Sequence, residues 1–164
     1  MNDRLALTFL TGKRRFNYRV AAVVIREGNV LVCREDDDDF VMLPGGRVEF
    51  GEGSAGALQR EIGEELGCRG KVGRLLFSAE SFFERDGERF HEIGKYYLVD
   101  LPADFPFSPG GTARVTRDEG HDLVFRWVRV APKALEAENL SPAFLWNALE
   151  QLPARTRFIV ADEG

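Results

Sequence analysis

The chain has 164 residues, a length typical of one domain. Hydrophobic residues make up 44% and charged residues 30%, which excludes a fibrous or disordered chain, and two cysteines are too few for a disulfide scaffold. The net charge of −5 disfavours binding to nucleic acid, and the apolar run at 5–10 is too short to span a membrane. We therefore expect one cytoplasmic domain over residues 1–164, with no nucleic-acid or membrane partner.

The first half of the sequence predicts three strands and then a helix, at 19–26, 30–33, 40–43 and 54–66. Gly28-Asn29 is a turn signal between the first two strands. Ser54 is expected to cap the helix, and Gly67 stands just past its end. Residues 1–18 are expected to add a strand, either within the domain or across a homodimer.

The second half predicts three more strands and a second helix, at 72–83, 90–101, 123–130 and 142–152. Asp86-Gly87 marks a hairpin turn, and the proline- and glycine-rich stretch 102–111 reads as a surface loop. Pro142 suits the first turn of the last helix. Mixed strands with two helices place the chain in the α+β class.

The predicted helix at 54–66 carries an unusual group of acids. Residues 35–65 hold ten carboxylates against two arginines. At about 100° per residue, Glu61, Glu64 and Glu65 share roughly 100° of the helix surface, apart from an apolar stripe. Their mutual repulsion and two glycines inside the helix both weaken it. A bound divalent cation would remove the repulsion, whereas a solvated acidic face is the alternative; for the acids at 36–39 we favour the solvated turn.

The stretch 46–68 resembles the signature of the Nudix hydrolases, the MutT-like pyrophosphohydrolases that act on nucleoside diphosphates linked to another moiety. In that signature a Gly is followed after five residues by a Glu, and after seven more by Arg-Glu-U-x-Glu-Glu-x-Gly-U, where U is bulky and apolar. The matching residues are Gly46, Glu52, Arg60, Glu61, Ile62, Glu64, Glu65 and Gly67, with Cys68 as a loose match at the last position. The resemblance implies a Nudix fold, in which a loop–helix–loop box lies on a mixed β-sheet within an α/β/α sandwich.

The resemblance also implies roles for the box residues. Glu61, Glu64 and Glu65 correspond to ligands of Mg²⁺ or Mn²⁺, helped by a backbone carbonyl at Gly45 or Gly46, and carboxylate oxygens suit these hard cations. Two further residues, Arg60 and Glu52, correspond to an ion pair that supports the box. A carboxylate near the attacking water accepts its proton, and the candidates are Glu61, Glu64 and Glu119.

The implied reaction is hydrolysis of a pyrophosphate bond by a metal-activated water, in a nucleotide or nucleotide derivative. Arg47, Phe83 and His91 are candidates for contacts with this small-molecule substrate, whose identity the sequence leaves open. A non-catalytic nucleotide sensor of the same fold is the alternative, although every carboxylate of the box is present.

Overall fold

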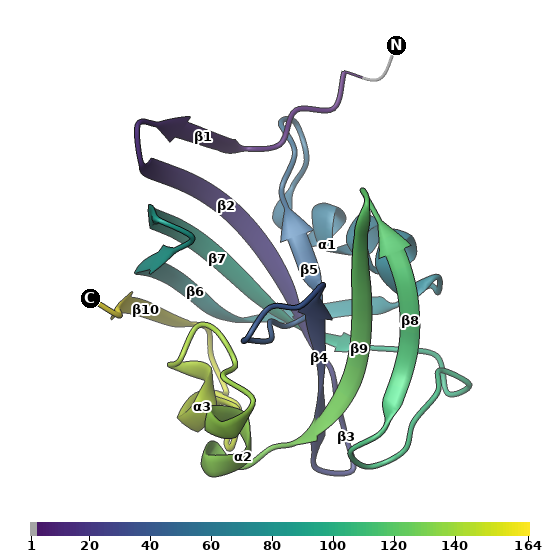
Figure 1. Ribbon diagram of the computed structural model, residues 1–164. Coiled ribbons are helices and arrows are strands. Elements are labelled where there is room, and N and C mark those ends of the chain that lie inside the picture. Colours follow the sequence, from purple (N-terminus) through teal and green to yellow (C-terminus); the bar gives the residue numbers. More distant parts are fainter. Residues whose placement is uncertain (1–2) are drawn as a thin grey trace.

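The computed structural model describes residues 3–164 (Figure 1). Ten strands and three helices follow one another as β1 Thr8–Thr11, β2 Arg14–Val23, β3 Ile25–Arg26, β4 Asn29–Glu35, β5 Gly45–Arg47, α1 Ser54–Leu66, β6 Lys71–Arg85, β7 Glu88–Asp100, β8 Thr112–Asp118, β9 His121–Arg129, α2 Pro132–Ala137, α3 Leu145–Ala148 and β10 Arg157–Asp162. None of the helices within residues 3–164 is long and apolar enough to span a membrane.

The strands form two sheets. One sheet has the order β1-β2-β7-β6-β10, with β5 also paired to β2, and the other has the order β3-β4-β9-β8. Parallel pairs, β2 with β7 and β6 with β10, stand beside antiparallel ones, so the larger sheet is mixed. The strand expected within 1–18 is β1, which pairs antiparallel with β2 of the same chain.

Strand β2 shows why helices lie on both sides of the larger sheet. Its apolar run is buried on both faces, and alternate residues point to opposite sides. Val20 and Ala22 join the core cluster that contains the apolar stripe of α1, whereas Ala21 and Val23 join the cluster that contains α2 and α3. In Figure 1, α2 and α3 lie together at the lower left, away from α1. This three-layer arrangement is the predicted α/β/α sandwich.

Helix α1 has the predicted bounds. Its buried apolar residues are Ala57, Leu58, Ile62 and Leu66. Gly67 ends the helix with a φ of 64°, a left-handed conformation that glycine adopts without a steric cost. The expected capping role of Ser54 is wrong: Gly53 occupies the N-cap position, and the Ser54 hydroxyl instead shares a 2.6 Å hydrogen bond with that of Tyr97. Ser54 thereby fastens the first turn of α1 to β7.

Three other expectations differ from the structure. The strand at 40–43 is reduced to single bridges, between Met42 and Cys33 and between Val41 and Leu140. The helix expected at 142–152 contains only the one-turn α3, and α2 precedes it. The chain turns repeatedly here because the buried leucines of this segment all belong to one cluster, at 135, 140, 145 and 149. The strands β8 and β10 were not predicted, since both are largely exposed and lack a clear apolar face.

We expect replacement of Gly63 by alanine to stabilise the protein by about 0.5–1 kcal/mol, because glycine inside a helix loses more backbone entropy on folding than alanine does. A Cβ at Gly63 meets no heavy atom within 4 Å. Urea unfolding of the variant measures the change. Gly67→Ala is the matched control and is expected to destabilise, because its φ of 64° is left-handed. A destabilised Gly63→Ala variant would contradict the prediction.

Candidate functional site

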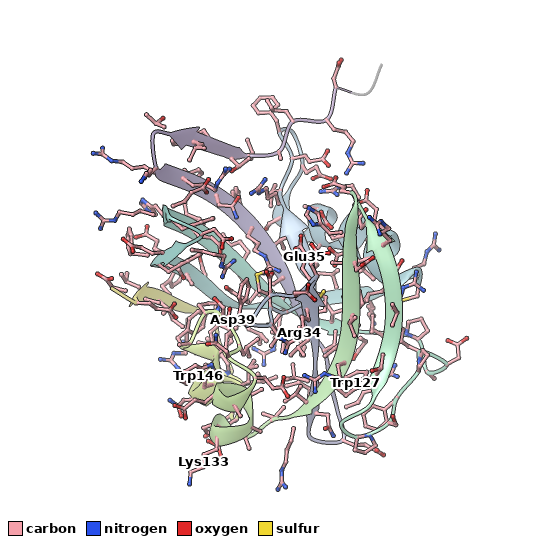
Figure 2. The ribbon with its side chains drawn as sticks, in the orientation of Figure 1. Arg34, Glu35, Asp39, Trp127, Lys133 and Trp146 are labelled. Carbon is pink, nitrogen blue, oxygen red and sulfur yellow. The ribbon has the colours of Figure 1, made fainter. Side chains whose placement is uncertain are left out.

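A cleft of about 420 Å³ brings together residues that are far apart in the sequence. It is lined by α1, by the glycine strand β5, by the floor strands β2, β6 and β7, and by the turn between β8 and β9. Figure 2 labels Glu35 near the end of β4, where that strand reaches the cleft, and Trp127 farther along the same sheet in its core. The three acids of α1 lie in this cleft.

The glutamates of α1 are held at different depths. Glu61 and Glu65 are only 8% and 9% exposed, whereas the side chain of Glu64 is 34% exposed. Glu61 lies directly against β5, because a Cβ added to Gly46 would stand 2.3 Å from its Oε1 atom. Glycine at position 46 is therefore required for the carboxylate to lie over the strand. The structure thus brings Gly46 and all three expected metal ligands into one cleft.

Arg60 connects the box acids to one another. Its Nε and Nη2 atoms donate to the two carboxylate oxygens of Glu52 at 2.8 and 3.0 Å. Its Nη1 atom donates to Glu61 at 3.0 Å and to Glu64 at 3.2 Å. Glu52 also accepts a hydrogen bond from the backbone N–H of Glu49, so this network joins the loop 49–52 to α1. The sequence-predicted pair of Arg60 and Glu52 is in direct contact.

The electrostatics of the two buried glutamates favour a bound cation. Burial raises the pKa of Glu65, and the neighbouring charge of Glu61 raises it further. Burial also raises the pKa of Glu61, although Arg60 acts against it. Two carboxylates that share a poorly solvated site are stabilised in their ionised form by added positive charge. The donor set of carboxylate oxygens beside an open glycine backbone therefore fits Mg²⁺ or Mn²⁺.

Arg4 covers the outer edge of this acidic wall. Its Nε atom donates to Glu49 at 2.7 Å, and its Nη2 atom lies 3.1 Å from Oε1 of Glu64. Arg4 is well exposed, so these contacts contribute little net free energy. They show that Glu64, the most accessible of the three acids, has a second cationic neighbour in addition to Arg60.

The floor of the cleft holds a buried polar chain. Arg47 donates through Nε to Oδ1 of Asn17 at 2.8 Å, and Nδ2 of Asn17 donates to Glu92 at 2.9 Å. Asn17 and Glu92 are buried on neighbouring strands, where their register pairs them directly. Of the candidate substrate contacts, Arg47 lines the cleft, as expected of such a residue.

The other two candidate substrate contacts lie outside this cleft. Phe83 is buried and stacks on Phe90 with ring centroids 4.8 Å apart. His91 projects from the opposite face of β7 and packs against Phe82 and Phe16, along a second hollow. The structure therefore does not bring Phe83 or His91 together with the box glutamates.

Glu119 occupies the turn between β8 and β9, with a φ of 49°. It lines the cleft beside Asp118, so the structure brings it to the same hollow as Glu61 and Glu64. Sequence reasoning missed Arg19 and Arg85, which also line the cleft. Arg19 carried a usable signal, because a charged side chain stands directly before the apolar run 20–25, and in the structure it is 9% exposed.

A small exposed cluster lies at the rim, where β4 meets β9. Nδ1 of His121 is 2.7 Å from Oδ2 of Asp36 and 3.2 Å from Oε1 of Glu35. Asp36 also accepts a hydrogen bond from the backbone N–H of Asp122 at 2.9 Å. Asp36 therefore fastens the loop after β4 to β9, in addition to lying at the surface.

We expect the His121 ring to titrate above its ordinary pKa of 6.5, because the hydrogen bond to Asp36 favours the charged imidazolium. While Asp36 stays ionised, the stability that the imidazolium contributes is fully present below pH 6.5, and it is lost as the pH rises through the raised pKa of His121. An NMR titration of the imidazole protons measures the pKa of His121. Asp36→Asn is expected to move the pKa of His121 back down, and equal values in both proteins would contradict the prediction.

The fold and the acidic helix together define a Nudix-type domain, and comparison with known proteins agrees. The family model described as NUDIX domain matches residues 15–151, so the chain belongs to the NUDIX family. Human diphosphoinositol polyphosphate phosphohydrolase NUDT4B is 36% identical over 88 residues, which cover 51% of this chain and 46% of that protein. The chain spans about half the length of the curated relatives it matches.

Solved structures confirm the predicted fold. A Nudix hydrolase from Nitrosomonas europaea matches with a TM-score of 0.61 and 16% identity, over 90% of this chain and 79% of that one. An ADP-ribose pyrophosphatase from Streptococcus suis matches with a TM-score of 0.54 and 13% identity, over 88% and 98%. At these identities the likeness concerns the fold, so the activity of this chain is argued from its own site.

Proposed function

We propose that the protein hydrolyses a pyrophosphate bond in a nucleoside diphosphate linked to another moiety, with the help of Mg²⁺ or Mn²⁺. One observation carries the proposal: Glu61, Glu64 and Glu65 meet Gly46 in a single open cleft that also contains basic side chains. A pyrophosphate group is strongly anionic, so an acidic wall attracts it only when cations lie between them. The cleft is therefore suited to a phosphate-bearing substrate that binds together with a divalent cation, and poorly suited to an anion that binds without one.

The cation would be held by the carboxylates of Glu61, Glu64 and Glu65. When bound, it would neutralise phosphate oxygens and lower the pKa of a coordinated water. Arg60 keeps Glu61 and Glu64 in place through its two Nη1 contacts. Glycine at 46 leaves room for the Glu61 carboxylate to lie against β5.

A carboxylate must also accept the proton of the attacking water. Glu119 suits this role because it reaches the cleft from the turn between β8 and β9, on a different element from the expected metal ligands of α1. Glu61 and Glu64 are the other candidates. Arg47, which is held by Asn17 at the floor, is available to a phosphate oxygen of the substrate.

The names of similar proteins suggest two substrate classes in addition to nucleoside triphosphates. The human relatives that match 51% of this chain are named diphosphoinositol polyphosphate phosphohydrolases. The structure from Streptococcus suis is named an ADP-ribose pyrophosphatase. All of these compounds contain a phosphoanhydride bond, which is the chemistry that the acidic cleft supports.

A phosphate-release screen tests the proposal. It would cover nucleoside triphosphates, nucleotide sugars, ADP-ribose, dinucleoside polyphosphates and diphosphoinositol polyphosphates, each with Mg²⁺, with Mn²⁺ and with EDTA. We expect turnover of at least one class with a divalent cation and none with EDTA. Nucleotide binding without any turnover would favour the non-catalytic sensor instead.

A further inference from the structure

Arg85, at the end of β6, is a cationic side chain that forms no ion pair with the residues described, 3–164. It lines the same cleft as the box glutamates, and it is half-buried. Its nitrogen atoms donate to two neutral acceptors, Oγ of Ser141 at 3.2 Å and Sδ of Met42 at 3.8 Å. Among residues 3–164, no carboxylate oxygen lies within 4.0 Å of its guanidinium, although Glu92, Asp38 and Asp86 act on it from farther away.

Aromatic rings enclose this guanidinium. Its central carbon lies 3.9 Å from the ring centroid of Phe40, 5.0 Å from that of Phe83 and 5.9 Å from that of Phe90. Stacking on aromatic faces stabilises a cation and fixes its orientation, but it leaves the in-plane N–H groups unoccupied by any anion. Burial lowers the pKa of Arg85, which is the cost of keeping the charge away from water. An anion bound there would remove that cost.

The other basic residues of the acidic wall are arranged differently. Arg60 contacts Glu52, Glu61 and Glu64, and Arg4 contacts Glu49 and Glu64. Both therefore balance the charge of the box itself. Arg85 is positioned apart from the box, with its charge available to a ligand.

The sheet order separates Arg85 from the place where the pyrophosphate bond would be cleaved. The strands run β5-β2-β7-β6, so β6 is three positions away from the strand that carries Gly46. At about 4.8 Å per strand the backbones of β5 and β6 lie roughly 14 Å apart, so the Arg85 side chain enters the cleft from a different side than the glycine strand does. A substrate that fills the cleft therefore presents a different part of itself to Arg85.

We propose that Arg85 binds a second anionic group of the substrate, one that lies beyond the diphosphate that is cleaved. This inference rests on the proposed function and narrows it to substrates that carry a further phosphate or carboxylate outside the diphosphate that is cleaved. A planar guanidinium held by stacking recognises such a group with two parallel hydrogen bonds. Arg85 is thus a specificity-determining residue for the proposed reaction.

Equilibrium binding tests the inference without requiring turnover. The probes are adenosine 3′,5′-bisphosphate and AMP, which differ by one phosphate and contain no pyrophosphate bond, measured by calorimetry in Mg²⁺. The wild type is expected to bind the bisphosphate at least about tenfold more tightly than AMP, since a hydrogen-bonded charge pair contributes about 1.5–3 kcal/mol. Arg85→Met is expected to abolish that preference while leaving AMP binding within about twofold.

The matched control is Arg89→Met, which removes the same charge from an exposed side chain of β7 that lies outside the cleft. This variant should keep the preference. Arg85→Lys retains the charge without the planar fork, and we expect it to recover only part of the preference. Equal loss of AMP and bisphosphate binding in a folded Arg85→Met protein would overturn the inference, because it would indicate a structural role or a contact with the cleaved diphosphate.

A turnover measurement separates this inference from the proposed function. For a substrate pair such as NADPH and NADH, Arg85→Met is expected to raise KM about 10- to 100-fold for the phosphorylated member only, with kcat nearly unchanged. If the screen finds no turnover at all, the proposed function fails, but the binding preference still decides the role of Arg85. A KM that rises equally for both members would contradict it.

Discussion

Replacement of Glu64 by glutamine is expected to lower metal-dependent turnover by about 1000-fold. The amide has nearly the same shape as the carboxylate but no charge, so the contacts of the fold are retained while one cation ligand is weakened. A metal ion contributes several kcal/mol to the stabilisation of the transition state, and each 1.4 kcal/mol corresponds to a tenfold change in rate. The measurement is kcat with Mg²⁺ on the best substrate of the screen.

The change in melting temperature on addition of metal tests independently whether the glutamates of α1 are metal ligands. Glu65 is 9% exposed and stands near Glu61, so Glu65→Gln removes a buried charge together with its repulsion. In EDTA the variant is expected to melt at or above the temperature of the wild type. Addition of Mg²⁺ should raise the melting temperature of the wild type by more than that of the variant, because ligand binding stabilises only a protein that binds it.

Glu136→Gln serves as the control for both measurements, because Glu136 is exposed on α2 and lies outside the cleft. Its turnover and its response to Mg²⁺ should match those of the wild type. Turnover within threefold of wild type in either Glu64→Gln or Glu65→Gln would rule out that residue as a metal ligand.

The acidic helix could be predicted from the sequence because all of its information is local. The spacing of Glu61, Glu64 and Glu65 fixes their common face, and the apolar stripe fixes which side of α1 is buried. The end of the helix followed from Gly67, whose left-handed backbone the structure confirms. The spacing did not predict how deeply each carboxylate is buried. The burial of Glu61 and Glu65 depends on strand β5, which lies against α1 at Gly46.

The floor of the cleft could not be predicted in the same way. Asn17 and Glu92 meet because β2 and β7 pair in parallel, and 75 residues separate them in the chain. Arg85 stands beside the predicted Asp86-Gly87 turn of the antiparallel β6–β7 hairpin, but its place over the cleft depends on how β7 pairs with β2. That parallel register has no local signature, because parallel neighbours are joined through long connections whose geometry depends on the whole sheet.

The edge strands were missed for a related physical reason. β8 and β10 each pair on one side only within their sheets, and Val115, Phe158 and Val160 are exposed. Alternation of apolar and polar residues marks a strand only when one face is buried. β8 mixes apolar and charged residues, and the short apolar run 158–161 of β10 shows no alternation, so neither stands out as a half-buried strand. Pairing with β9 and with β6, rather than the sequence of the strands themselves, determines their conformation.

Removal of Arg60 is expected to be the most destabilising change among the charged residues of the cleft. Its guanidinium bonds to Glu52, Glu61 and Glu64 and is only 21% exposed. In Arg60→Met the carboxylates remain close together without their shared positive partner. Loss of one partner from a fully buried pair costs about 3–5 kcal/mol, and partial solvation here reduces the expected loss in EDTA to about 2 kcal/mol.

Urea unfolding of Arg60→Met, with and without Mg²⁺, measures this effect. A divalent cation supplies the missing positive charge, so Mg²⁺ should raise the free energy of unfolding more in the variant than in the wild type. Arg117→Met is the matched control, because Arg117 pairs with Asp122 at the surface and its loss should cost less than about 0.5 kcal/mol. If the two variants were equally stable, Arg60 would be a solvated surface charge and the acids of the box would not depend on it. A larger loss that Mg²⁺ leaves unchanged would instead show that Arg60 acts through the loop at Glu52 alone.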